Sequence, residues 1–506
     1  MRSKFSLVFL AVASSCGNVQ APVDGGTPRL PEPSSAPLAT EVSWQLAHAF
    51  DPQPGHAPKD AAGRAWLESR GFADVSLGAG ITRRDLTLDG GAAPSPGASP
   101  TLLVRFVHLA DTQLADDESP ARVVTFDVIG ATGGAYRPQE AWGCNALNAA
   151  VRTINKLHAS LPVDAVILGG DNRDNAQGNE AAWFRDLLDG AEVECDSGDD
   201  DDPVPGPGND PKDALFSEGL QMPWLWVTGN HDTLNQGNFA ITDAIRASAV
   251  GTDAQLQTID WSKPGQPVTT TVVADARRAP MVGSELLDFI GASGDGHGLS
   301  APGAKTDGKA FYAYDVPHAP VRFIVLDTTA PTGGADGLLL RADVEARVKP
   351  LLEEAEAQGK YVLLFSHHPP PSFTDGSGFG GTGQPGAMLA PEWRDFLAQY
   401  PHVVMHVGAH THKFRASAVT PATGHAFFET ETSSLTDWPQ QLRVFELWDE
   451  GNGFLRVRAT PLDFTEENDP LAKEFRRRSA MDFTAGWADV TLNDNGAVDF
   501  WFPTVP

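Results

Sequence analysis

Five short apolar runs in this sequence each end in residues that could bind a metal ion. The polar stretches that follow them are Asp111-Thr112-Gln113, Gly170-Asp171, Gly229-Asn230-His231-Asp232, His367-His368 and His410-Thr411-His412. Carboxylate, amide and imidazole groups are hard or borderline donors, which suit Mn, Fe or Zn better than a soft metal. Two such ions about 3.5–4 Å apart can clamp the attacking and leaving oxygens of a phosphoester and activate a water between them. The pattern therefore indicates metal-assisted hydrolysis of a phosphoester.

The apolar runs themselves are predicted to be buried and largely parallel strands. They cover residues 102–107, 164–168, 223–227, 361–365 and 403–407, and they alternate with helical patterns at about 141–159, 179–188 and 340–358. In open α/β sheets, ligands bind at the carboxyl ends of the strands, so residues far apart in sequence can meet there. We therefore expect an α/β fold. The tail is predicted to be β, with runs at 442–448 and 454–459 and a hairpin across Asn493-Asp494-Asn495-Gly496.

In their order along the chain, these polar stretches resemble the motifs of the calcineurin-like metallophosphoesterases. That family carries Asp-x-His, Gly-Asp, Gly-Asn-His-Asp/Glu, His and Gly-His-x-His, each on a loop after a strand. The resemblance covers about residues 101–440. It implies a four-layered α/β/β/α sandwich, which we place at 101–440, with a β-rich C-terminal extension at 441–506 that packs on the same domain.

The resemblance also implies a role for each residue of the motifs. Asp171 would bridge two divalent or trivalent metal ions (Mn, Fe or Zn). The other ligands would divide between the ions, with Asp111 and His412 at the first and Asn230, His367 and His410 at the second. A hydroxide held by the ions would attack the phosphorus, while His231 protonates the leaving oxygen. Asp232, assigned with His231 to the catalytic residues, and Asp174 would orient a ligand or His231.

Several positions depart from the family pattern or leave alternatives open. Gln113 stands where the family usually has His, so the first ion would gain an amide-oxygen ligand or none, and Ala409 replaces a Gly. A non-catalytic binding module with a degraded first metal site is therefore an alternative. Arg173 is a candidate phosphate contact or an exposed, uninvolved Arg, and His368 is a candidate substrate contact. The stretch 429–439 either reaches the rim of the site or is a plain strand and turn.

The composition is strongly acidic, with 37 Lys and Arg against 66 Asp and Glu and a formal net charge of −29. Nucleic-acid binders neutralise phosphates with clustered Lys and Arg, so this balance argues against a nucleic-acid partner. It favours a small-molecule or membrane-derived phosphoester as substrate. Five of the seven residues 196–202 are Asp. This loop is predicted to be a solvated insertion; the alternative is Ca²⁺ binding in a surface or structural protein.

The N-terminal sixteen residues are typical of an export signal, with Arg2 and Lys4, an apolar run at 5–13, and small residues before Cys16. The order resembles a bacterial lipoprotein signal, in which Cys16 is lipidated; an ordinary secretory signal is the alternative. We place the signal at 1–16, a Pro/Gly/Ser-rich tether at 17–42, and an N-terminal extension and linker at 43–100.

The protein is thus expected to be exported to the bacterial periplasm or cell envelope, where its lipid anchor would be its sole contact with the membrane. Two cysteines in such an oxidising compartment can pair. A Cys144–Cys195 disulfide is therefore a hypothesis, which the sequence alone does not decide.

Overall fold

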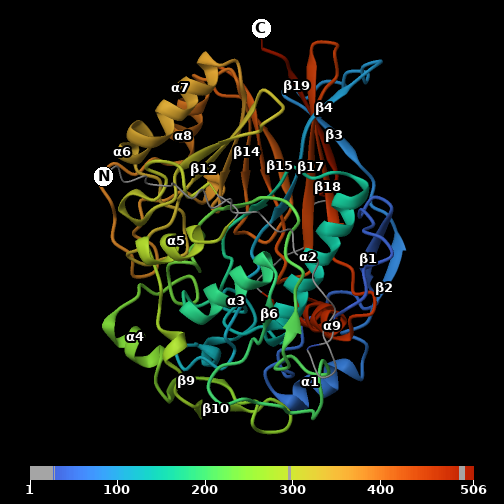
Figure 1. Cartoon of the computed structure of the whole chain (residues 1–506), viewed down its shortest axis with the longest axis vertical. Coiled ribbons are helices and arrows are strands. Elements are labelled where there is room, and N and C mark those ends of the chain that lie inside the picture. The colour runs from blue at the N-terminus through green and yellow to red at the C-terminus, as the bar shows by residue number, and fades with distance from the viewer. Residues whose placement is uncertain (1–26, 28, 295–297, 489–495, 506) are drawn as a thin grey trace, which may run out of the picture.

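The structure is a computed structural model that describes residues 27, 29–294, 298–488 and 496–505 of the 506-residue chain (Figure 1). The expected signal, Cys16 and most of the expected hairpin at 493–496 lie outside the described residues. Among the described helices, none combines the length and the apolar character needed to cross a bilayer.

Two β-sheets pack face to face at the centre of the described residues (Figure 1). The first has the strand order β3-β19-β18-β17-β4-β5-β8 and the second the order β11-β12-β13-β14-β16-β15. Phe106 of β4 lies between the sheets, with its ring centroid 5.1 Å from that of Phe323 and 5.5 Å from that of Phe365. The strands of the first sheet are β3 (Arg84–Thr87), β4 (Thr101–Leu109), β5 (Ala165–Leu168), β8 (Trp224–Trp226), β17 (Gln441–Asp449), β18 (Phe454–Asp463) and β19 (Val498–Pro503). Those of the second are β11 (Tyr312–Asp315), β12 (Val321–Leu326), β13 (Tyr361–Ser366), β14 (Val403–Gly408), β15 (Arg415–Val419) and β16 (Phe427–Glu431).

Helices cover the outer faces of both sheets. In β12, Phe323 belongs to the core between the sheets, whereas its neighbour Ile324 packs in a second core with α7 (Lys349–Ala357) and α8 (Ala390–Leu397). Because successive strand residues face opposite sides, β12 must be apolar on both. On the other side of the molecule lie α2 (Gly143–Ser160), α3 (Gly178–Asp189) and α9 (Pro470–Thr484). The predicted α/β/β/α sandwich is thus confirmed.

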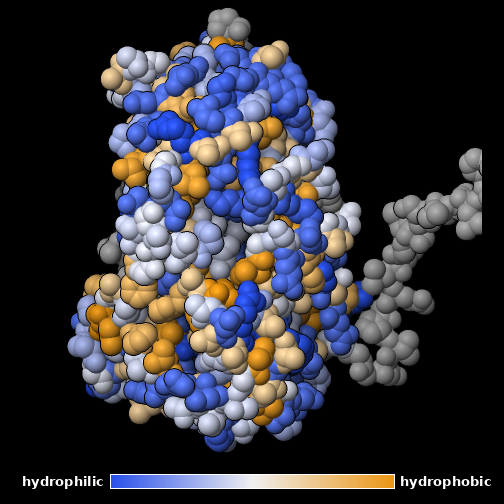
Figure 2. Space-filling view, turned by 90° about the vertical axis from the view of Figure 1, so that its left-hand side faces the viewer, coloured by the Kyte–Doolittle hydropathy of each residue, from blue (hydrophilic) through white to orange (hydrophobic). Residues whose placement is uncertain are grey.

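The smaller elements surround this sandwich. They are β1 (Val42–Leu46), α1 (Ala61–Glu68), β2 (Val75–Ala79), β6 (Glu192–Val193), β7 (Leu215–Phe216), α4 (Asp243–Ala249), β9 (Asp253–Ile259), β10 (Val268–Thr271), α5 (Ser284–Gly291) and α6 (Arg341–Asp343). On the face shown in Figure 2, hydrophobic residues form scattered patches among hydrophilic ones, as is usual for a folded protein surface.

The strands that carry the candidate ligands are parallel within each sheet. The pairs β4–β5 and β5–β8 are parallel in the first sheet, and β12, β13, β14 and β16 are parallel in the second. Their carboxyl ends therefore lie at one edge of each sheet, which is where the polar stretches begin.

Both ends of the described chain are built into the domain. Strand β17 pairs with β4 and β18, so the C-terminal strands form the middle of the first sheet. The tail also contains α9, a helix that the prediction of a β-rich tail omitted. Its start carries two helix signals, because Asp469 accepts a hydrogen bond from the Ala472 backbone N and Pro470 occupies the first turn.

The N-terminal segments also contact the domain. From the expected extension, β3 pairs with β19. Within the expected tether, Ser34 donates its backbone N–H to Glu467 at 2.8 Å, and Leu38 forms a bridge with Leu462. Residues 29–42 therefore lie against the domain.

A disulfide joins Cys144 and Cys195, whose Cα atoms are 6.5 Å apart. It links the start of α2 to the acidic loop 196–202. The structure thus contains the pairing that the sequence left undecided.

Candidate metal centre

Loops after β4, β5, β8, β13 and β14 bring the candidate ligands into one buried cluster. The Nε2 atom of His367 lies 3.0 Å from Asp171 Oδ2 and 3.0 Å from Asn230 Oδ1. Asp111 Oδ1 lies 3.3 Å from His412 Nε2, and Asp111 Oδ2 accepts the backbone N–H of His410. Donor atoms of Asp111, Asp171 and His367 all lie within 4.8 Å of one another.

The backbone at these ligands is unusual. Asp111, Gln113, Asp171, His410 and His412 all have left-handed φ values, between 43° and 69°. Non-glycine residues rarely adopt this conformation, and it is concentrated at functional sites, where the surroundings enforce it. Close packing adds to this constraint, because a Cβ on Gly229 would collide with the backbone N and carboxylate of Asp171. The Gly-Asn-His-Asp loop must therefore begin with glycine.

The cluster has the features of a cation site. Asp111 Oδ1 and Gln113 Oε1 are buried and accept no hydrogen bond within the described part of the chain. An unsatisfied buried oxygen is costly, and a cation would satisfy it. The donor set of carboxylates, amides and imidazoles fits Mn, Fe or Zn. The residues present therefore fit the metal ions that the sequence predicts.

His367 is oriented by its second ring nitrogen. Its Nδ1 lies 2.9 Å from the carbonyl O of Gly169, so Nδ1 carries a proton and Nε2 faces the cluster. Burial alone would lower the pKa of His367, but the carboxylates of Asp171 and Asp111 raise it to about 9. A positive charge at Nε2 is thus favoured at the place where a metal ion would bind.

His412 is held by Asp437, a residue that the sequence did not single out. Its Nδ1 lies 2.6 Å from Asp437 Oδ2, and Arg137 Nε donates to Asp437 Oδ1 at 3.0 Å. Against the effect of burial, Asp111 and Asp437 raise the pKa of His412 to about 10. Asp437 belongs to the stretch 429–439, which therefore reaches the site.

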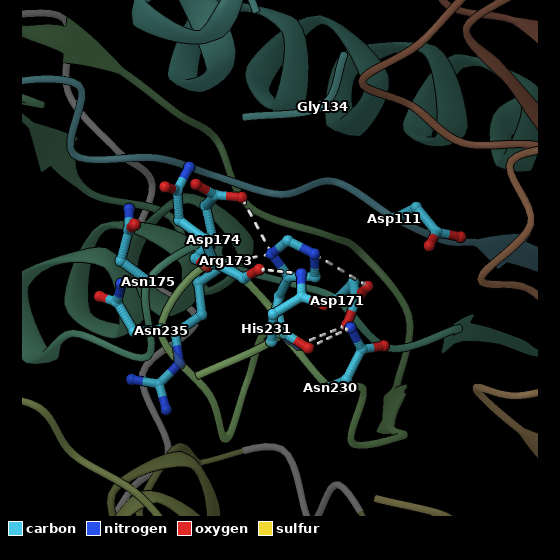
Figure 3. A network of polar contacts seen from close by, with 12 residues as sticks. Asp111, Gly134, Asp171, Arg173, Asp174, Asn175, Asn230, His231 and Asn235 are labelled. Carbon is cyan, nitrogen blue, oxygen red and sulfur yellow. Dashed lines mark hydrogen bonds and ion pairs between the residues drawn. The ribbon is translucent and has the colours of Figure 1, made fainter. Parts of the chain in front are cut away.

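His231 lies beside the cluster with its ring between two carboxylates (Figure 3). Its Nδ1 is 3.0 Å from Asp174 Oδ1, its Nε2 is 3.9 Å from Asp171 Oδ2, and its backbone N–H donates to Asp171 Oδ1 at 2.8 Å. Although burial alone would lower it, Asp171 and Asp174 raise the pKa of His231. The ring therefore favours the protonated form that a general acid needs.

Asp232 uses both of its carboxylate oxygens to hold the neighbouring loops together. Its Oδ2 accepts hydrogen bonds from Gly229 N at 2.8 Å and from Asn172 Nδ2 at 3.1 Å. Burial raises its pKa to about 6, although Arg173 opposes that shift. Asp232 therefore ties the loop after β8 to the loop after β5.

Arg173 is neither a phosphate contact nor an exposed side chain in this structure. Its guanidinium is fully buried and donates to the carbonyl oxygens of Gln177 at 2.7 Å, Asp232 at 2.5 Å and Met281. Its position directly after the Asp171 turn suggested a site role, but the side chain stabilises surrounding loops instead.

His368 also differs from its expected role as a substrate contact. Its Nδ1 pairs with Thr328 Oγ1 at 2.9 Å and its Nε2 with the Ala335 carbonyl at 2.8 Å. Its ring centroid lies 4.6 Å from that of His410. Both nitrogens are engaged, so His368 packs beside His410 and leaves no ring nitrogen for a substrate.

The acidic loop forms a cluster of its own around a buried lysine. Lys212 Nζ lies 3.0 Å from Asp117, 3.4 Å from Asp196 and 3.6 Å from Glu118. Carboxylates of Glu118, Asp196 and Asp201 come close enough to hold a cation. Lys212 already supplies a positive charge there, which weakens the case for Ca²⁺.

A four-layered α/β/β/α fold with Asp, Asn and His side chains clustered at strand ends defines a metal-dependent hydrolase. Residues 104–414 match the family model of the calcineurin-like phosphoesterases, and the chain belongs to this family. As a member it is a hydrolase that acts on phosphoester bonds, and the family depends on two metal ions.

The solved structures that match this chain are distant from it in sequence. One is a dimetal phosphatase from Danio rerio, at 13% identity over 71% of this chain and 97% of that chain, with a TM-score of 0.39. A sulfate thiohydrolase, SoxB, from Thermus thermophilus has 13% identity over 74% and 61%, with a TM-score of 0.31. GAP50, an inner-membrane-complex anchor of Plasmodium, has 13% identity over 78% and 98%, with a TM-score of 0.28. Comparison with the curated proteins finds no significant match.

Proposed function

We propose that this phosphoesterase hydrolyses a small or membrane-derived phosphomonoester or phosphodiester at two metal ions, with His231 as the general acid. Asp171 would bridge the ions. The first ion would be held by Asp111, His412 and the amide oxygen of Gln113, and the second by Asn230, His367 and His410. The observation that carries this proposal is the meeting of five strand-end loops around unsatisfied buried oxygens, with the ring of His231, whose pKa is raised, beside them.

The metal ions, when bound, would lower the pKa of a water and neutralise charge on the phosphoryl group. The protein's own part is positioning and proton transfer. The backbone carbonyl of Asp174 accepts from His231 Nδ1 at 3.0 Å, Asp174 Oδ1 lies 3.0 Å from the same nitrogen, and these contacts direct Nε2 toward the cluster. From there His231 would donate its proton to the leaving oxygen.

Charge supports a small substrate. The net charge of −29 would repel a long polyanion, so nucleic acid is not the expected substrate. The signal-like residues 1–16 support export to the bacterial periplasm or envelope, with a lipid anchor at Cys16. An anchored enzyme would meet phosphoesters released from, or still part of, the membrane.

The direct test is hydrolysis of an aryl phosphate monoester and the matching diester by the Mn²⁺-loaded full chain. We expect His231→Ala to lower kcat by two or more orders of magnitude, the scale of general-acid catalysis. His318→Ala is the matched control, because that imidazole is exposed and lies 3.6 Å from Asp164, outside the candidate metal centre. If the wild-type chain binds one ion or none per molecule and turns over neither ester, the non-catalytic binding module with a degraded first metal site replaces this proposal.

A further inference from the structure

A buried chain of charged side chains connects the candidate general acid to a ligand of the first metal ion. It runs in the order His231, Asp174, Arg122, Glu140, Arg137, Asp437 and His412. Three of its members, Arg122, Arg137 and Glu140, come from the connection between β4 and α2. None of these three belongs to a family motif.

On the side of the general acid, Arg122 links two carboxylates. Its Nη1 lies 3.2 Å from Asp174 Oδ2, and its Nη2 lies 2.6 Å from Glu140 Oε2. The other carboxylate oxygen, Oδ1, lies 3.0 Å from His231 Nδ1, which also contacts the backbone carbonyl of Asp174 at 3.0 Å. The orientation of His231 therefore depends on Asp174, and that of Asp174 on Arg122 and Glu140.

On the side of the metal ligand, Glu140 acts through the neighbouring turn. The same Oε2 accepts the backbone N–H of Arg137 at 3.1 Å. Arg137 then donates to both oxygens of Asp437, at 3.0 and 3.3 Å, and Asp437 holds His412. Oε2 of Glu140 thus fixes both halves of this series of charged side chains, the half that ends at His231 and the half that ends at His412.

Burial makes these contacts restrictive. Arg122 is 1% exposed and Glu140 is 6% exposed. Water cannot replace a lost partner at such depth, so removing one member leaves an uncompensated charge and the others must move. A shift at Glu140 would then reach His231 and His412 together.

We propose that Glu140 is a positioning residue that fixes His231 relative to His412, so that proton donor and first metal ion act on the same phosphoester. Glu140 contacts neither reacting atoms nor the candidate ligands. The inference rests on the proposed function, because it assigns His231 and His412 the roles given above.

The main experiment is Glu140→Gln, which keeps the shape of the side chain and replaces one of its two acceptor oxygens by an amide nitrogen, a group that cannot accept a hydrogen bond from Arg122 or Arg137. We expect kcat for the aryl ester to fall about 10- to 100-fold, the scale of a misplaced catalytic group, while KM changes by less than about 2-fold. The visible absorption of the Co²⁺-loaded chain should also change, because His412 shifts. The matched control is Glu450→Gln, which breaks another buried pair, Glu450–Arg456, at 2.6 Å.

Measuring the same substitution in the His231→Ala variant distinguishes a positioning role of Glu140 from a general loss of stability. When His231→Ala is already present, Glu140→Gln should lower kcat by a smaller factor than in the wild type, because its effect through His231 is gone. An equal factor in both backgrounds would overturn the inference. So would a folded Glu140→Gln variant with unchanged kcat and an unchanged Co²⁺ spectrum, or one that behaves like Glu450→Gln.

Two further results keep the inference distinct from the proposed function. Absence of turnover in the wild type would contradict the proposed function, whereas the Co²⁺ spectrum would still report whether Glu140 positions His412. Should Glu140→Gln not fold, Arg122→Lys removes the fork that joins Asp174 to Glu140 and retains the charge. The same loss of kcat at constant KM is expected, and wild-type kcat in that variant would overturn the inference.

Discussion

At His367, a single ring nitrogen faces more acceptors than one proton can satisfy. Nε2 lies 3.0 Å from both Asp171 Oδ2 and Asn230 Oδ1, while Nδ1 is engaged with Gly169. The Asn230 amide nitrogen donates to Gly237, which leaves its oxygen directed at the cluster. A cation at this point would satisfy all of these groups.

Metal binding should therefore stabilise the folded chain. At a Mn²⁺ concentration about 100 times Kd, the free energy of unfolding should rise by about 2.7 kcal/mol. His367→Ala should lose most of this gain, and His318→Ala should keep it. Urea unfolding with and without Mn²⁺ measures the effect, and an equal gain in both variants would contradict the assignment of His367 as a ligand.

Gln113 should set the metal preference of the first site. Gln113→His replaces an oxygen donor by an imidazole, which Zn²⁺ binds well. We expect the ratio of Zn²⁺ to Mn²⁺ affinity at one of the two sites to rise about 10-fold or more, as measured by competition calorimetry. An unchanged ratio would mean that Gln113 is not a ligand.

At the scale of elements, the loops that follow the strands carry the residues of the candidate metal centre. Close packing of the backbone holds these loops in place. Gly237 follows the His231 loop with φ +65°, and a Cβ there would collide with the His231 ring and lie 2.5 Å from Asn230 Nδ2. The loop must approach the ring this closely to keep it in place.

Gly237→Ala should therefore lower kcat by about 10-fold or more, the scale of a misplaced catalytic group. Gly283→Ala is the matched control, because Gly283 has a similar φ of +59° but nothing within 4 Å of an added Cβ. The control should lose about 1–3 kcal/mol of stability, because φ +59° with ψ −132° is a strained conformation for alanine, and it should lose no activity. Equal kcat values in the two variants would show that backbone strain alone explains the effect.

The Cys144–Cys195 bridge closes a loop of 51 residues between α2 and the acidic loop. Replacing both cysteines by serine should lower the free energy of unfolding by about 2–4 kcal/mol, since the bridge restricts the unfolded chain. Urea unfolding of this variant, compared with the wild type with and without reductant, tests the prediction. A variant as stable as the oxidised wild type would contradict it.

The sequence revealed most of the elements that bear the site but few of their partners. Strands β4, β5, β8, β13 and β14 and the polar residues that follow them could be predicted, because apolar runs and their polar ends are local signals. Asp437, Arg137 and Glu140 could not, since their roles arise from contacts across the fold. The buried position of Arg173 was hidden for the same reason: adjacency to Asp171 does not determine where a long side chain turns.

At the scale of the whole molecule, the N-terminal extension packs on the connection that holds Glu140. Lys59 donates to the Asp127 carbonyl at 2.9 Å and lies 4.0 Å from its carboxylate. Burial raises the pKa of Asp127 to about 7, although Lys59 opposes this shift. The folded chain therefore binds a proton at Asp127 that the unfolded chain releases near its ordinary pKa of 3.8.

Because this pKa is raised in the folded state, its contribution to stability is present at low pH and is lost as pH rises from about 4 to about 7. The loss is at most about 4 kcal/mol, since each pKa unit corresponds to about 1.4 kcal/mol. Asp127→Asn should lack this pH-dependent loss. The unfolding free energy of the variant should therefore rise relative to that of the wild type as pH rises. Urea unfolding at several pH values measures this difference, and a constant difference would contradict the prediction.

The pairing of β4 with β17 has a consequence for how the chain is made. Phe106 of β4 lies opposite Phe445 of β17, so the strand that leads to Asp111 gains this neighbour only after most of the chain has been synthesised. Such non-local pairing folds slowly, because the intervening chain must first be closed into a loop. A growing chain would therefore remain open for most of its synthesis, the condition in which a polypeptide can be threaded through a narrow translocation channel. The late arrival of β17 would thus give the proposed exported protein time to leave the cytoplasm before its metal centre can form.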